Sequence, residues 1–352
     1  MHACSAVLPA LIVSLSACDN PVSKPGPLSF LSDAPPPDDP PLIQFRIGGE
    51  VSGEADDGFG SAIAADADEA WIGAPHGPIG RIYRWDRSSI NLALEHSGRA
   101  GAHLTTTPSG LWVGAPLVNS GAGAVLDIDG TVQAADYDGT GIALSGAGGG
   151  TYGHATGWVA KDGRAGTTAG RPAALAEANG VIGAGMPLGE IALSWASQQI
   201  RRPTVGDELG FALAVADVDG DGFEDWITGS PGTNTVVAYS YSNASRLREW
   251  SGRGRFGSSV VVCDLNKNGT PDLVVGSPVD GDNGTITWFP DLSPVEAELI
   301  VDWPSGIQLL GAALACVPDG LLVGAPGDAA EHGRVIWIES MTQAQQGRAT
   351  DR

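Results

Sequence analysis

The stretch DDGFGSAIAADADEAWIGAPHGPIGRIYRW, residues 56–85, decides the fold because its pattern returns later in the chain. The clearest second copy is LLGAALACVPDGLLVGAPGDAAEHGRVIW, residues 309–337. Both contain a glycine after an apolar residue, a short apolar run, the sequence Gly-Ala-Pro and a further apolar run that ends in tryptophan. A unit repeated at this spacing predicts a propeller or a solenoid.

Seven such units follow one another over roughly residues 42–340, at about 43 residues each, which is the size of a four-stranded propeller blade. The third and fourth units depart most from the pattern, so a count of six blades stays open. In every unit one glycine opens the first apolar run and another closes the second. The pairs are Gly60 and Gly73, Gly101 and Gly114, Gly141 and Gly153, Gly170 and Gly183, Gly210 and Gly229, Gly257 and Gly276, and Gly311 and Gly324.

Each unit is expected to form a twisted meander with two apolar faces, which only stacking around an axis can bury. Glycine in the turns permits positive φ and close backbone approach near the crowded axis. Tryptophans recur at equivalent places, which predicts packing between blades more than a platform for sugars. They are Trp71, Trp112 and Trp226 before the Gly-Ala-Pro segment, and Trp85, Trp158, Trp195, Trp288 and Trp337 on the third strand.

The ring needs a closure, and the sequence offers one. The apolar residues 42–47 precede the first unit, while the last unit ends after its third strand at Trp337 and Ile338. We expect the N-terminal strand to complete the last blade and so to remove an open sheet edge.

Phe59-Gly60 with Gly73-Ala74-Pro75, and Phe256-Gly257 with Gly276-Ser277-Pro278, resemble the FG-GAP repeat of integrin alpha-subunit propellers and their bacterial relatives. The resemblance covers most of the chain. It implies an all-β, seven-bladed β-propeller over residues 42–340, followed by a disordered C-terminal tail over residues 341–352.

Two units carry six extra residues between their first and second strands: DVDGDGFED at 217–225 and DLNKNGTPD at 264–272. Oxygen donors at positions 1, 3 and 5, a glycine at 6, a carbonyl at 7 and a carboxylate at 9 suit a hard cation. The pattern resembles the EF-hand loop but closes with aspartate at position 9, a version that integrin-type propellers carry.

These loops predict two Ca²⁺ sites with a structural role, the first tighter because it holds four carboxylates against two. In the family such loops lie opposite the usual ligand surface. The expected ligands are Asp217, Asp219, Asp221, the Phe223 carbonyl and Asp225 in the first site, and Asp264, Asn266, Asn268, the Thr270 carbonyl and Asp272 in the second.

The N-terminal residues read as a targeting segment. The apolar stretch from Ala6 to Leu15 is too short to span a bilayer and suits a signal-peptide core. Leu15-Ser16-Ala17-Cys18 resembles the bacterial lipobox, which implies a signal peptide over 1–17, a lipid anchor at Cys18 and a Pro-rich tether over 18–41. The expected location is the cell envelope, periplasmic or surface-exposed, with membrane contact only through the lipid. A secreted protein or a cytoplasmic one stays open.

Cys263 and Cys316 lie six and five residues after the opening glycines of adjacent units. An offset of one residue places them on opposite strand faces. We therefore expect two buried free thiols more than a disulfide.

Composition and missing motifs exclude some classes of function. The chain has 19 Lys and Arg against 41 Asp and Glu, for a net charge of −22. Nucleic acid is thus an unsuitable partner. The sequence contains no nucleophile elbow, H-E-x-x-H motif or P-loop, so an enzyme is not expected.

Four arginines, Arg201, Arg202, Arg253 and Arg255, lie in loops that lead into consecutive units and open on one face. They could bind an acidic glycan or a carboxylate side chain of a protein. Solvated arginines that balance neighbouring acids are the alternative. The sequence thus favours a non-catalytic binding or adhesion platform, with a scaffold for envelope assembly or a carbohydrate-active enzyme as alternatives.

Overall fold

The computed structural model describes residues 46–54, 57–66, 68–77, 79–135, 139–146, 149–201, 203–204, 206–294, 298–300, 307–327 and 332–339. All of them belong to one unit, residues 43–352. The expected signal peptide, Cys18, the tether and the C-terminal tail lie outside the described residues. No helix among the described residues is both long and apolar enough to cross a membrane.

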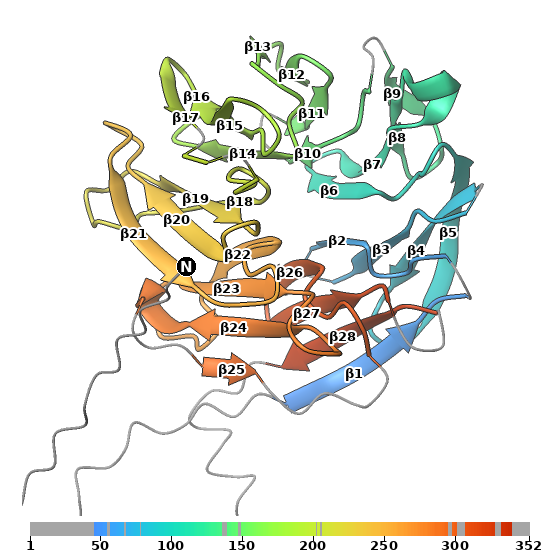
Figure 1. Ribbon diagram of the computed structural model, residues 1–352. Coiled ribbons are helices and arrows are strands. Elements are labelled where there is room, and N and C mark those ends of the chain that lie inside the picture. The colour runs from blue at the N-terminus through green and yellow to red at the C-terminus, as the bar shows by residue number, and fades with distance from the viewer. Residues whose placement is uncertain are drawn as a thin grey trace, which may run out of the picture. The chain divides into compact units, whose positions relative to one another are not determined.

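Seven antiparallel sheets of four strands each form a ring, which confirms the all-β propeller and the count of seven blades (Figure 1). Blades 1 to 3 contain β2 (Ala62–Ala65), β3 (Ala70–Ala74), β4 (Ile79–Trp85) and β5 (Ile90–Ser97); β6 (His103–Thr107), β7 (Gly110–Ala115), β8 (Ala124–Asp127) and β9 (Val132–Ala134); and β10 (Leu144–Ser145), β11 (Thr151–His154), β12 (Gly157–Ala160) and β13 (Ala165–Thr167). Blade 4 contains β14 (Ala174–Ala178), β15 (Val181–Gly185), β16 (Ile191–Trp195) and β17 (Gln198–Arg201).

Blade 5 contains β18 (Leu213–Ala216), β19 (Asp225–Ser230), β20 (Thr235–Tyr239) and β21 (Arg246–Ser251). Blade 6 contains β22 (Ser259–Cys263), β23 (Asp272–Ser277), β24 (Thr285–Phe289) and β25 (Glu298–Ile300), and blade 7 begins with β26 (Ala313–Val317), β27 (Gly320–Ala325) and β28 (Arg334–Glu339). Two short 3₁₀ turns, η1 (Val118–Gly121) and η3 (Pro290–Leu292), interrupt the loops.

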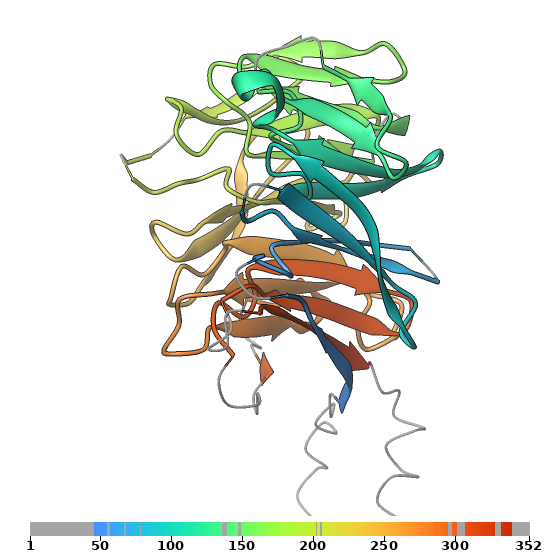
Figure 2. The same ribbon diagram turned by 90° about the vertical axis from the view of Figure 1, so that its right-hand side faces the viewer.

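The N-terminal strand closes the ring, as expected. β1 (Arg46–Ser52) pairs antiparallel with β28 and becomes the fourth strand of blade 7. Arg46 lies opposite Glu339, and Ser52 lies opposite Arg334. Figures 1 and 2 show this strand, in blue, beside the red strands of the last blade. The first and last parts of the fold therefore share one hydrogen-bonded sheet.

Neighbouring blades touch through glycine backbone. In six blades the opening glycine donates its N–H to the closing glycine, as from Gly60 to the Gly73 carbonyl at 3.1 Å. The closing glycine in turn faces the opening glycine of the next blade. A Cβ atom on Gly73 would lie 2.0 Å from the Gly101 carbonyl oxygen, and one on Gly276 would lie 2.0 Å from that of Gly311. Any side chain at these positions would push two blades apart.

Blade 4 is the exception, and the predicted pair Gly170 and Gly183 is wrong. Register places Gly185 opposite Ala174, so the closing glycine is Gly185 and the opening position is Pro172. Proline has no N–H to donate. Ala173 supplies the bond to the Gly185 carbonyl instead, at 2.8 Å.

Cys263 and Cys316 form a disulfide with Cα atoms 6.4 Å apart, so the expectation of free thiols is also wrong. The one-residue offset places the two side chains on opposite faces of their strands, but this does not keep them apart. Two blades that are neighbours in a ring turn opposite faces of their first strands toward each other, so an odd offset brings the side chains together. The disulfide joins the first strands of blades 6 and 7.

The apolar core lies between blades, in a series of clusters that each draw mainly on two neighbouring sheets. Trp226 and Trp288 are fully buried, and the Trp195 and Trp226 rings of blades 4 and 5 lie 5.6 Å apart. The predicted packing of tryptophans between blades is confirmed for these residues.

The corrected register of blade 4 gives a matched pair of variants. Gly185→Ala places a Cβ 2.2 Å from the Gly210 carbonyl oxygen, whereas a Cβ on Gly170 has no neighbour nearer than 3.5 Å. We expect Gly185→Ala to lower the free energy of unfolding by about 1–3 kcal/mol or more, as overpacking does. Gly170→Ala should leave it unchanged or slightly higher, since alanine restricts the unfolded chain. Equal losses in chemical denaturation would contradict this register.

Candidate metal centre

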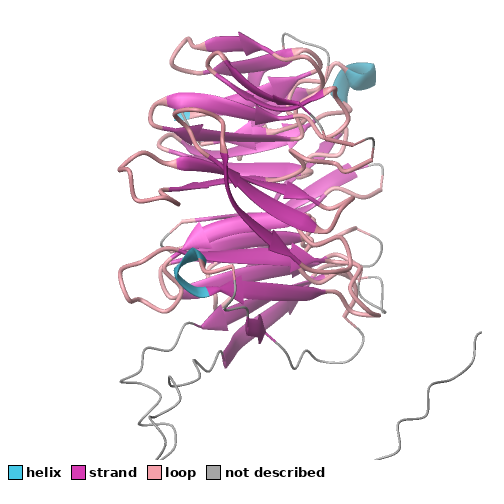
Figure 3. Cartoon of the chain, turned by 60° about the vertical axis from the view of Figure 1, so that its left-hand side comes forward, coloured by secondary structure: helices cyan, strands magenta, loops and turns pink. Residues whose placement is uncertain are grey.

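The two acidic loops occupy the same place in adjacent blades. Residues 217–224 connect β18 to β19, and residues 264–271 connect β22 to β23, as expected. In a meander of four strands, the loops after the first and third strands open on one face. The loops after the second strand and those that lead into the next blade open on the other. Figure 3 shows loops projecting from both edges of the strands.

The first loop gathers three of its four predicted carboxylates. One oxygen each from Asp217, Asp219 and Asp225 lies within 4.8 Å of the others, whereas Asp221 does not belong to this close group. Backbone amides hold Asp217, whose Oδ1 accepts from Gly220 N at 2.7 Å and whose Oδ2 accepts from Gly222 N at 2.9 Å. The loop is therefore curled around its own acidic side chains.

Asp225 is the anchor of this group. Its side chain is fully buried and accepts the N–H groups of Val218 and Tyr241, each at 3.0 Å. Burial raises its pKa above the usual value, and the nearby Asp219 and Asp221 raise it further. A buried carboxylate beside other carboxylates is costly to ionise, and a divalent cation would remove that cost. The donor set fits a hard cation.

The second loop repeats the frame with fewer charges. Asp272 is buried and accepts from Leu265 N and Asp291 N, each at 2.9 Å, and burial raises its pKa. Asp264 accepts from Asn268 N at 2.9 Å and from Gly269 N at 2.8 Å. The equivalent bonds in both loops indicate that the two sequences adopt one conformation.

The other expected ligands are present in the loops without a demonstrated role. Asn268 Oδ1 accepts the Thr270 N–H at 2.7 Å, and Asn266 Oδ1 accepts the Asn268 N–H at 3.0 Å. Phe223 is half exposed, and its ring stacks on Tyr241 with centroids 6.1 Å apart.

Residues outside the motifs also hold the loops, and sequence reasoning missed them. Asn179 of blade 4 accepts from Glu224 N at 3.1 Å and donates to the Glu224 carbonyl at 2.9 Å. Asn268 Nδ2 donates to Asp291 Oδ1 at 2.8 Å. Asn179-Gly180 is a recognisable turn, but its partner depends on how blades stack, which the sequence does not state.

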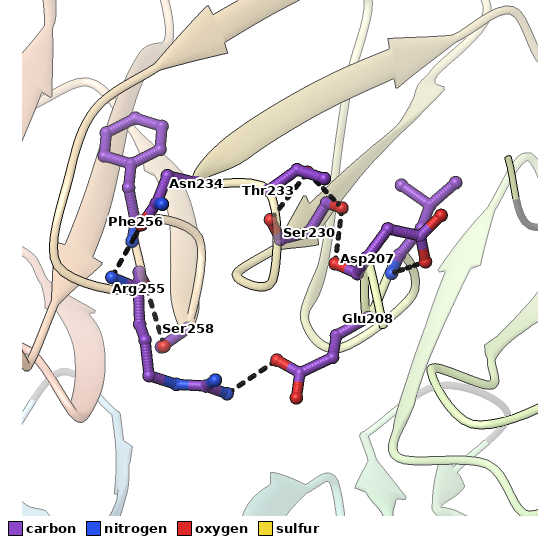
Figure 4. Close-up of polar contacts among 9 residues, drawn as sticks. Asp207, Glu208, Ser230, Thr233, Asn234, Arg255, Phe256 and Ser258 are labelled. Carbon is purple, nitrogen blue, oxygen red and sulfur yellow. Dashed lines mark hydrogen bonds and ion pairs between the residues drawn. The ribbon is translucent and has the colours of Figure 1, made fainter. Parts of the chain in front are cut away.

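Three of the four arginines, Arg201, Arg253 and Arg255, lie at or in loops of the opposite face. Arg255 pairs with Glu208 at 2.7 Å and covers the Phe211 ring at 5.7 Å, and Asn234 Oδ1 accepts its backbone N–H at 2.7 Å (Figure 4). Arg201 pairs with Glu190. Arg253 makes no ion pair within the described residues, and Arg202 lies outside them. Two of the four arginines predicted to bind an anion are therefore already paired with carboxylates of this chain.

Comparison with known proteins supports this fold. Residues 198–275, which span both acidic loops, match the family model of the FG-GAP-like repeat. Phosphatidylinositol-glycan-specific phospholipase D of Bos taurus is 34% identical over 122 residues, covering 28% of this chain and 14% of that protein. Integrin alpha-V of Gallus gallus is 34% identical over 84 residues, covering 22% of this chain and 8% of that protein. The chain spans only a small part of the length of these relatives.

Among solved structures, a chain in "Crystal Structure of Mitotic Checkpoint Complex" aligns with a TM-score of 0.60 and 16% identity, covering 89% of this chain and 99% of that one. This likeness shows the fold alone. The protein is a seven-bladed β-propeller. More narrowly, residues 198–275 of this propeller match the FG-GAP-like repeat, and integrin alpha chains are among the relatives that the chain resembles in part.

The metal sites predict a measurable calcium response. Titration calorimetry should resolve two sites with dissociation constants of about 10⁻⁴ to 10⁻³ M. Saturating calcium at about 100 times the dissociation constant should stabilise the fold by about 2.7 kcal/mol per site.

A single substitution tests the first site. Asp219→Asn should weaken calcium binding there at least tenfold, because it removes one carboxylate from the close group. Asp129→Asn, in the exposed acidic turn of blade 2, is the control and should change neither site. Absence of heat and of any melting shift up to about 10 mM calcium would rule out the sites.

Proposed function

We propose that this chain is a calcium-stabilised, membrane-anchored β-propeller that acts as a non-catalytic binding or adhesion platform in the bacterial cell envelope. Its ligand would be a protein or an acidic glycan bound by loops on the face opposite the metal loops. The supporting observation is where the exposed apolar side chains lie.

Leu117, Leu188 and Val279 follow the second strands of blades 2, 4 and 6, and their exposed fractions are 51%, 82% and 52%. Phe211 and Leu309, at the start of blades 5 and 7, are 37% and 41% exposed and open on the same face. Exposed apolar groups gathered on one face are typical of an interaction surface. Varied loops on a fixed ring are where binding residues commonly lie.

Calcium would be held by the carboxylates of Asp217, Asp219 and Asp225 in blade 5, and by Asp264 and Asp272 with Asn266 and Asn268 in blade 6. When bound, the ion supplies positive charge that offsets repulsion among these groups. Asp225 and Asp272 already fix the loops to the blades through backbone N–H groups, so an ion there would stiffen the face away from the ligand.

Anchoring rests on the lipobox-like residues that end at Cys18 and on the Pro-rich stretch behind them. A lipid at Cys18 with a tether of some 24 residues would hold the propeller off the membrane surface. An integrin among the relatives agrees with an adhesive role, whereas a phospholipase among them keeps an enzymatic role as the competing proposal.

A photo-crosslinking amino acid placed on each face tests this function in the cells that make the protein. At Leu188 it should yield one reproducible adduct with an envelope protein or glycan, and the adduct should remain in the membrane fraction. At Leu92, which is 51% exposed but lies on the outermost strand of blade 1, it should yield none. Adducts at both positions or at neither, or turnover of the captured molecule by the purified chain, would contradict the proposal.

A further inference from the structure

The first strands of all seven blades surround the axis of the ring (Figure 1). Residues of all seven blades line a central cavity of about 650 Å³. This volume is in the range of sites that hold small molecules. The lining includes one large aliphatic residue from every blade at an equivalent position, three residues after the opening position, and three of the seven are also buried in the core between blades. The seven are Ile63, Leu104, Leu144, Leu175, Leu213, Val260 and Leu314.

The serine hydroxyls in the wall already donate to backbone carbonyls of the chain. The Ser61 hydroxyl donates to the Gly58 carbonyl and that of Ser258 to the Arg255 carbonyl, both within the loops that lead into the blades. The Ser259 hydroxyl donates to the Gly311 carbonyl. Besides these serines, two polar side chains line the cavity, and both of them break the repeat. The inner edges of the seven first strands add backbone polar groups to the wall.

Arg171 is the first departure. In the other six blades the residue before the opening position is apolar or Thr140, and all six are buried: Phe59, Ala100, Thr140, Leu209, Phe256 and Leu310. In blade 4 the opening residue is Pro172, and the residue before it is Arg171, which is exposed and lines the cavity. The guanidinium lies beside Gly139, where an added Cβ would be 2.6 Å from Nη2.

Arg171 makes no hydrogen bond or ion pair with any residue in the described parts of the chain. That is notable in a chain of net charge −22, where Arg81, Arg84, Arg164, Arg201 and Arg255 all have carboxylate partners. A guanidinium with no partner among the described residues, at the mouth of the cavity, is complementary to a carboxylate.

His103 is the second departure. Two residues after the opening position the other six blades carry alanine or serine, whereas blade 2 carries His103, which lines the cavity. Burial lowers the pKa of its imidazole to about 4, so the ring is neutral near pH 7. Arg171 is consequently the cation that the described cavity wall presents to a ligand.

Two apolar side chains extend the cavity at its mouth. Leu188 is 82% exposed and Phe211 is 37% exposed, and both contribute to the lining. A ligand with an apolar body would bury their surfaces, and removing apolar surface from water favours binding.

We propose that this cavity binds an amphiphilic carboxylate, with its aliphatic body inside the ring of first strands and against Leu188 and Phe211, and its carboxylate on Arg171. The site is separate from the metal loops, and it does not depend on whether the surrounding face also binds a macromolecule. Positions where a single blade departs from the residue shared by the other blades are expected at functional sites.

Decanoate, kept below its micelle concentration, tests the site by titration calorimetry on the full chain. The wild-type protein should bind one decanoate saturably, and Arg171→Gln should weaken binding at least tenfold without lowering the melting temperature. Arg246→Gln, another exposed arginine but one paired with Glu249 and outside the cavity lining, should leave the affinity unchanged. Decanol and decyltrimethylammonium should bind at least tenfold more weakly than decanoate, since neither pairs with a guanidinium.

Three outcomes would overturn the proposal. The first is the absence of saturable decanoate binding. The second is equal affinity of wild type and Arg171→Gln, and the third is equal affinity for decanoate and decanol. Failure of these tests leaves the crosslinking result at Leu188 unaffected, so the two proposals are separable.

Discussion

The ring depends on the contact between the closing glycine of one blade and the opening glycine of the next. At Gly73 and Gly101, and again at Gly276 and Gly311, the backbones of two sheets approach so closely that a methyl group would overlap a carbonyl oxygen. This approach allows the first strands to surround one axis and places apolar faces against each other over their whole length. Tryptophans such as Trp226 and Trp288 then fill the wider space farther out, where neighbouring blades diverge.

Because the contact fixes the blades, variation is confined to loops and to a few wall positions. Blades 5 and 6 lengthen the turn after the first strand and gather carboxylates there. Blade 1 uses a shorter turn in which Arg84 pairs with Glu69 and lies 5.8 Å over the Trp71 ring. A guanidinium thus supplies in blade 1 the positive charge that a cation would supply in blades 5 and 6. Blade 4 changes the contact itself, and that change exposes Arg171 at the central cavity.

Much of this fold could be predicted from the sequence, because residues that make the same contact in each blade recur at the same spacing. The seven units, the N-terminal strand in the last blade and the acidic loops between first and second strands all follow from spacing. Blade 4 could also have been aligned correctly, because Gly185-Met186-Pro187 keeps the spacing of Gly73-Ala74-Pro75 and Gly183 does not. The disulfide was missed because face alternation within a strand was considered without the turn from one blade to the next. Arg171 and His103 carry no motif, and their positions become informative only once equivalent residues are aligned in space.

A crystal structure of the chain grown with calcium, with anomalous data to locate the ions, tests the account most directly. We expect one calcium ion among Asp217, Asp219 and Asp225, a second between Asp264 and Asp272, and Pro172 in the place of an opening glycine. Loops without an ion at saturating calcium, or a ring closed without these glycine contacts, would contradict it.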